Sequence, residues 1–252
     1  MAVEFRQVDF MQEGALADPT IIALVRALWN RRFFRTLATM LKDQQAWAQS
    51  VQALLRQCGT DASLEDLLPL ATAVEEMLHN MPAWLAQEQN PNGAVRGAIF
   101  EGFCRRWSAT KWRPGLPLAY GCAAYLDGAV LRGGRTVDVG YARESVGFGE
   151  FKVSTWWFRQ RRTFAFLRDL KRATTHPDTG EPTVIALSLD FASEVVQEAV
   201  QQGYEGVQVY GYRELLDSVE GRRVIPVVAR RSPPRRVSGP TSRRSIRRTR
   251  RH

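Results

Sequence analysis

With 252 residues, 44% of them apolar, the chain can form one large or two small domains with a sizeable core, and no apolar run is long enough to cross a membrane. Its first ten residues carry three charges where a signal peptide would be apolar, and Cys58, Cys104 and Cys122 are too few and too scattered for a disulfide framework or a CxxC metal site. The net charge of +9 comes from residues 230–252, which hold ten arginines and no acid, whereas 25 basic and 26 acidic residues nearly cancel in the rest of the chain. We therefore expect a cytoplasmic protein with no membrane partner.

Residues 1–92 are expected to form a helical region. Asp18 followed by Pro19 is typical of a helix start, and apolar residues recur after it at helical spacing. The Asn-Pro-Asn-Gly segment at 90–93 is a turn cluster and marks the end of this region. Three roles stay open for it: recognition of DNA, formation of a homodimer, or packing against the rest of the chain.

Residues 93–229 are expected to form an α/β core, a mixed sheet flanked by helices. Helical periodicity gives way to short strands separated by turn residues, and then to helices and strands in alternation. The expected elements are a helix at 94–108, strands within 117–153, a helix at 155–174, a strand at 183–189, a helix at 192–202, a strand at 206–212, a helix at 212–219 and a strand at 223–229. The tail at 230–252 is rich in Arg, Ser and Pro and has almost nothing to bury, which predicts disorder.

One strand-like hairpin carries Asp138, Glu150 and Lys152 where a buried strand would carry apolar residues. A tight turn at 144–145 would place Asp138 about 5 Å from Glu150 or Phe151, and Glu150 shares a face with Lys152 because the strand period is two. Two close carboxylates repel each other unless a cation lies between them, and hard oxygen ligands suit Mg²⁺. A lysine beside that ion can orient or help deprotonate an attacking water, and its charge favours a phosphoryl transition state. The alternative is an exposed salt bridge of at most about 1 kcal/mol.

The E-x-K spacing is weak evidence by itself. Lys171 follows Asp169 in a similar way on a predicted helix, where we expect a solvated pair. Two further acids compete for the site, Asp127 in a turn and Asp190 at the end of a strand. We interpret Asp190 as the N-cap of the helix that follows it.

The pattern D-x11-E-x-K, with a helix before it and a helix and a strand after it, resembles the PD-(D/E)xK nuclease superfamily, which has the restriction-endonuclease-like fold. The resemblance covers residues 94–210 and departs from the family pattern at Val137, where many members have proline. It implies that Asp138 and Glu150 hold Mg²⁺, with Mn²⁺ as an alternative, and that Lys152 serves the attacking water. The backbone carbonyl of Phe151 is implied as a further metal ligand.

A glutamate on the preceding helix reaches the metal in many members of that superfamily, and Glu101 matches it. A carboxylate among the neighbouring aromatic residues would be partly desolvated, which is costly without a partner such as a metal ion. The alternative is that Glu101 lies on the rim and pairs with Arg105.

Arginines and tryptophans follow the E-x-K motif. Arg161, Arg168 and Arg172 recur on one face of the predicted helix 155–174 and could hold the DNA backbone, although a solvated basic face is an equally good interpretation. Trp156 and Trp157 are expected in the core rather than as platforms for base stacking. The basic tail is interpreted as a phosphate clamp or as a solubilising segment.

Two functions of different classes follow. The first is a Mg²⁺-dependent deoxyribonuclease that hydrolyses DNA phosphodiester bonds, with restriction or defence as its candidate role. The second is a non-catalytic protein that binds nucleic acid or assists assembly, in which the acids are structural. Convergence of Asp138, Glu150 and Lys152 at one end of the sheet favours the first, and side chains that point to different faces favour the second.

Overall fold

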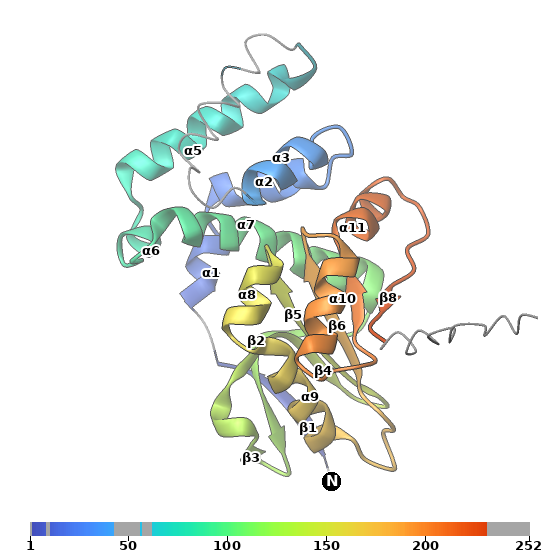
Figure 1. Cartoon of the computed structure of the whole chain (residues 1–252). Helices are drawn as coiled ribbons and strands as arrows, with labels where there is room; N and C mark the ends of the chain where they lie inside the picture. The colour runs from blue at the N-terminus through green and yellow to red at the C-terminus, as the bar shows by residue number, and fades with distance from the viewer. Residues whose placement is uncertain (1, 9–10, 43–55, 57–61, 231–252) are drawn as a thin grey trace, which may run out of the picture.

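The computed structural model describes residues 2–8, 11–42, 56 and 62–230 of the chain (Figure 1). The disorder predicted for the tail therefore lies outside the described residues, apart from Arg230. Within them, a mixed eight-stranded sheet is flanked by helices, as the sequence predicts for the fold class.

The sheet combines an antiparallel half with a parallel centre. Its strands follow the order β1-β2-β4-β5-β6-β7-β8, with β3 paired to β2, and only the β5–β6 and β6–β7 pairs are parallel. The strand bounds are β1 (Val3–Gln7), β2 (Ala119–Leu126), β3 (Ala129–Val130), β4 (Thr136–Ala142), β5 (Val146–Lys152), β6 (Thr183–Ser188), β7 (Gln208–Tyr210) and β8 (Val227–Val228). β6 is a nearly continuous apolar run, which suits a strand that is covered on both faces.

Helices cover both faces of this sheet. The helix bounds are α1 (Met11–Leu16), α2 (Pro19–Leu28), α3 (Phe34–Lys42), α5 (Leu68–Asn80), α6 (Ala83–Ala86), α7 (Pro91–Trp107), α8 (Thr155–Gln160), α9 (Thr163–Thr174), α10 (Ala192–Gln201) and α11 (Tyr212–Val219), with short 3₁₀ or π turns at Ala62–Leu67, Ser108–Trp112 and Arg132–Gly134. The central strands supply both cores: Phe151 and Ile185 belong to the cluster that contains α7, and Phe148 and Ala186 to the cluster that contains α9 and α10.

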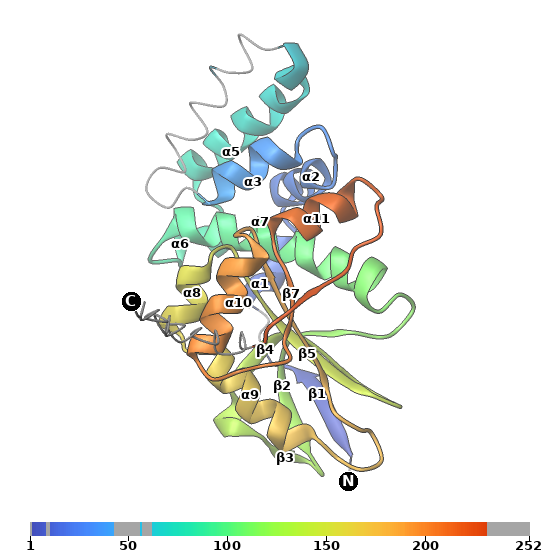
Figure 2. The same cartoon turned by 45° about the vertical axis from the view of Figure 1, so that its right-hand side comes forward.

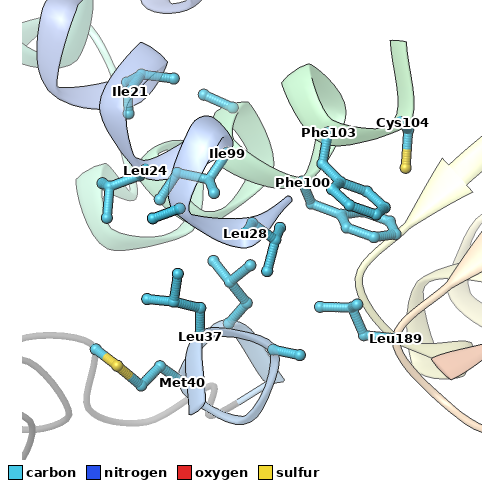
Figure 3. Packing of buried hydrophobic residues seen from close by; sticks show 14 of the residues in the cluster. Ile21, Leu24, Leu28, Leu37, Met40, Ile99, Phe100, Phe103, Cys104 and Leu189 are labelled. Atoms are coloured by element: carbon cyan, nitrogen blue, oxygen red, sulfur yellow. The ribbon is translucent and has the colours of Figure 1, made fainter. Parts of the chain in front are cut away.

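Helix α7 lies between the sheet and helices α2, α3 and α5, which Figures 1 and 2 show above it. Its start is fixed by Asn90, whose side chain accepts a hydrogen bond from the Gly93 backbone N–H, and by Pro91 in the first turn. In Figure 3 apolar side chains of α2, α3 and α7 pack together beside Leu189, which follows β6. The N-terminal helices and the α7 side of the sheet therefore share one hydrophobic core.

The N-terminal region is helical where the pattern predicts helices, and Asp18 caps α2 by accepting from the Thr20 backbone N–H. Residues 3–7 differ from the expectation, because they form β1 and pair antiparallel with β2. The partner strand lies more than a hundred residues further along the chain, so local periodicity gives no sign of this pairing.

The prediction of a single helix at 155–174 is wrong, because this segment forms two helices, α8 and α9. Arg162 between them has a φ of 46°, in the left-handed region. The Gln202 side chain stabilises the break: its Oε1 accepts from the Phe164 backbone N–H at 2.9 Å, and its Nε2 donates to the Phe158 carbonyl at 3.0 Å. One side-chain amide, distant in the sequence, therefore forms hydrogen bonds with backbone groups of both α8 and α9.

Candidate active site

The β4–β5 hairpin brings the predicted acids together. Its register runs from Ala142 opposite Val146 to Val139 opposite Gly149, and the next step along both strands places Asp138 opposite Glu150. The turn is closed by a hydrogen bond from the Arg143 N–H to the Ser145 carbonyl, which confirms the predicted turn. Glycine is required at 149, because a β-carbon there would collide with Ile185 on β6.

Asp138, Glu150 and Lys152 converge as the sequence predicts. The Lys152 Nζ lies 2.8 Å from Asp138 Oδ2 and 2.6 Å from Glu150 Oε2. The Phe151 backbone N–H donates to the same Asp138 oxygen at 2.5 Å. The side chains of Asp138, Glu150 and Lys152 are only 22%, 5% and 15% exposed, so the alternative of an exposed surface salt bridge is wrong.

Glu101 joins this cluster from helix α7. It is buried, and its Oε1 accepts from Arg105 Nε at 2.9 Å, so it pairs with Arg105 but does not lie on a solvated rim. Arg105 is held in turn by Glu13, at 2.8 Å, and its guanidinium lies 4.9 Å from the centre of the Tyr120 ring. Arg105 therefore fixes the orientation of Glu101, and is itself held by Glu13 and Tyr120.

Burial and mutual repulsion perturb the two glutamates. Burial, together with the charge of Asp138, raises the pKa of Glu150 to about 7 against the opposing effect of Lys152. Burial and Asp138 likewise raise the pKa of Glu101 to about 7, against Arg105. Both carboxyls therefore lie close enough to Asp138 to feel its charge, and a cation placed among them would relieve the repulsion.

The same carboxylates act on Lys152 in the opposite sense. Burial alone would lower the pKa of Lys152, but Asp138 and Glu150 outweigh it and raise the pKa above its ordinary value. Lys152 is consequently a permanent ammonium at neutral pH.

A cavity of about 480 Å³ opens over the cluster. Asp138, Lys152 and Glu101 line its buried part, whereas Glu150 meets Lys152 without lining it. The described residues contain no group of three or more His, Cys, Asp or Glu side chains arranged to hold a metal ion. The contacts above use Asp138 Oδ2, Glu150 Oε2 and Glu101 Oε1, which leaves the second oxygen of each carboxylate as a hard donor of the type that Mg²⁺ prefers.

The three arginines predicted to bind DNA do not form one stripe, because the helix that would carry them is broken. Arg161 precedes α9 and lies at the cavity, with its guanidinium 5.7 Å from the centre of the Trp157 ring. Arg168 pairs with Asp169 at 3.1 Å, while Arg172 is exposed. Of these three arginines, only Arg161 lies at the cavity beside the acidic cluster.

The competing acids lie elsewhere. Asp127 accepts from the Ala2 backbone N–H at 2.7 Å. Asp190 does not cap the helix that follows it: it accepts from the Thr155 backbone N–H at 2.6 Å, at the start of α8, and pairs with Lys42 at 2.7 Å. Burial would raise the pKa of Asp190, but the hydrogen bonds from Lys42 and Thr155 lower it. Lys171 pairs with Glu181, at 2.7 Å, and has no role in the cluster.

Several residues of the cavity were not predicted from the sequence. Trp84 on α6 and Arg96 on α7 line it, and so does Trp157, which was expected in the core. Its neighbour Trp156 is 44% exposed, so the core expectation is wrong for that residue. The one sign of this wall in the sequence is the pair of adjacent tryptophans after the E-x-K motif, which was interpreted as core.

Among the described residues, no helix has both the length and the apolar character needed to cross a bilayer. Comparison of the sequence with protein-family models gave no match, and comparison with curated proteins gave none either.

Proposed function

We propose that the protein is a Mg²⁺-dependent nuclease that hydrolyses DNA phosphodiester bonds, with a core of the restriction-endonuclease-like type. The observation that carries the proposal is the convergence of Asp138, Glu150 and Lys152 beside the cavity that Glu101 enters from α7. The order of elements supports it: helix α7, the meander β2-β4-β5, helices α8 and α9, and then strand β6 parallel to β5.

The residues present fit a hard divalent cation. Asp138 and Glu150 would hold Mg²⁺ or Mn²⁺, with Glu101 and the Phe151 carbonyl as further ligands. Burial is the main cause of the raised pKa values of both glutamates and the charge of Asp138 adds to it, and such an ion would neutralise that repulsion. When bound, the ion supplies positive charge that polarises the phosphate and makes water more acidic.

Lys152 contributes a fixed positive charge. In the metal-free protein Asp138 and Glu150 raise the pKa of Lys152 against burial, so its side chain is an ammonium group that donates hydrogen bonds. It can orient an attacking water and stabilise the extra negative charge of the transition state, which is the larger contribution in a partly buried site. Arg161 at the cavity, Arg168, Arg172 and the basic tail would supply contacts to the phosphate backbone.

Plasmid cleavage in Mg²⁺ or in EDTA tests the proposal, with Lys152→Ala as the variant and Lys171→Ala as its matched control. Both lysines follow an acid by two residues, but only Lys152 contacts Asp138. We expect Lys152→Ala to lower the cleavage rate by about 10²-fold or more, and Lys171→Ala to leave it unchanged. Cleavage by Lys152→Ala at the wild-type rate would contradict the role assigned to this lysine.

A further inference from the structure

The cavity over the acidic cluster has a second set of side chains, which the proposed chemistry does not use. Trp84 on α6 and Trp157 on α8 both line it, and Figures 1 and 2 show α6 above α8 on the same side of the molecule. Aromatic rings at a partly open cavity are surfaces on which a flat ligand can stack.

Both tryptophans are held in place. The Trp84 Nε1 donates to Asp18 Oδ2 at 3.1 Å, so the residue that caps α2 also fixes this ring. The Trp157 ring meets Trp156 edge-on, with 4.6 Å between the ring centres, and lies under the Arg161 guanidinium. A site built of anchored rings loses little conformational entropy when it binds a ligand.

The charges of the wall fit a nucleotide. Three acids and three cations line the cavity, and two of the acids, Asp138 and Glu101, belong to the candidate metal site. Arg161, exposed at the end of α8, is a cation at the cavity that can meet a phosphate group, and Glu88 is an exposed acid. The side chains of Gln89 and Asn90 add hydrogen-bonding groups of the kind that can meet base edges.

The size of the cavity favours one nucleotide over a duplex. A volume of about 480 Å³ lies within the range of small-molecule pockets, about 300 to 1,000 Å³, so it accepts a nucleotide-sized group but not stacked base pairs. A base inside a duplex cannot enter a pocket of this size, whereas a base of a single strand or of an extruded nucleotide can.

We propose that this cavity binds one nucleotide of a single-stranded DNA segment or unpaired end, with its base stacked against Trp157 and Trp84. The assignment rests on the proposed nuclease function, which it deepens by naming unpaired DNA as the substrate class. Arg161 binds an adjacent phosphate, so that the strand is led toward Asp138 and Lys152.

Binding in EDTA tests this assignment without any cleavage. Fluorescence anisotropy with the full chain would compare a labelled single strand of about 12 nucleotides, a length within known single-strand site sizes, with a duplex of the same sequence. Trp157→Ala should weaken single-strand binding by at least about fivefold, as expected for the loss of one stacking platform, and should change duplex binding less. Trp157→Phe keeps a ring and should restore most of the affinity, which excludes a mere folding defect.

Phe191→Ala is the matched control, because Phe191 is an aromatic residue, 56% exposed, that does not line the cavity. It should bind the single strand as the wild type does. Single-strand binding by Trp157→Ala at wild-type affinity would overturn the assignment, and so would an equal loss in Phe191→Ala. If Mg²⁺-dependent cleavage is present but Trp157→Ala binds the single strand normally, the nucleotide-binding proposal is refuted and the nuclease proposal stands. If cleavage is absent but the loss on Trp157→Ala is observed, the nuclease proposal fails and the binding site stands.

Discussion

Replacement of Glu150 by glutamine should stabilise the metal-free protein at alkaline pH. Glu150 is buried and its pKa is about 7 instead of the ordinary 4.5, so the folded state holds a proton on this carboxyl more tightly than the unfolded state does. Its ionisation therefore costs folding free energy. The loss begins near pH 4.5, grows as the pH rises to about 7, and is constant above that value.

The magnitude follows from the shift of the pKa. One pKa unit corresponds to about 1.4 kcal/mol, so this shift corresponds to about 3 kcal/mol at pH 8. Glutamine has the shape of glutamate without its charge, and Lys152 keeps its contact with Asp138 at 2.8 Å. We expect Glu150→Gln to gain about 2–3 kcal/mol at pH 8 and almost nothing at pH 4.5.

Urea unfolding in EDTA at these two pH values measures the effect. Glu181→Gln is the control, because Glu181 is 72% exposed and its loss should matter little at either pH. Mg²⁺ should stabilise the wild type at pH 8 and should stabilise Glu150→Gln less, since that variant lacks one of the proposed ligands. A variant that is no more stable than the wild type at pH 8 would refute the claim that ionisation of this buried carboxyl costs folding free energy.

Two further predictions concern other parts of the chain. A chain that ends at Ala229 should fold normally but bind DNA more weakly and with a flatter dependence on salt, because ten arginines are lost; equal affinity and equal slope in a salt titration would eliminate the phosphate-clamp interpretation. Asp190→Asn should destabilise the protein by about 1 kcal/mol at pH 7, because it weakens the link between Lys42 and the start of α8. The pKa of Asp190 is lowered, so this stability is present above about pH 3.8 and is lost as the pH falls further, and unfolding curves at pH 7 and pH 3 should show the difference shrinking.

The convergence of Asp138, Glu150 and Lys152 could be predicted because it depends on local structure. A short turn fixes the hairpin register, and the two-residue period of a strand fixes the shared face. Glu101 was predicted to lie near these residues, since one helix leads into the meander. Burial among aromatic residues and pairing with Arg105 were expected as alternatives, whereas the structure shows both together.

The features that the sequence did not reveal depend on distant partners. The break between α8 and α9 is stabilised by Gln202. Asp190 contacts Thr155 and Lys42 and does not cap α10, the helix that follows it. The wall of the cavity forms only when the N-terminal helices pack over the sheet and bring Trp84 to the site. The hydrophobic periodicity of the N-terminal helices or of the strands does not indicate which residues of the two regions will be in contact.

The most direct test of the central claim is the rate of Mg²⁺-dependent plasmid cleavage by the wild type and by Asp138→Asn. Asp138 contacts both Lys152 and the Phe151 N–H, and after burial its charge is the next cause that raises the pKa values of both glutamates. We expect cleavage that EDTA abolishes and that Asp138→Asn lowers by about 10²-fold or more, together with weaker Mg²⁺ binding by the variant. Cleavage that persists in EDTA, or that proceeds at the wild-type rate in Asp138→Asn, would contradict the proposed function.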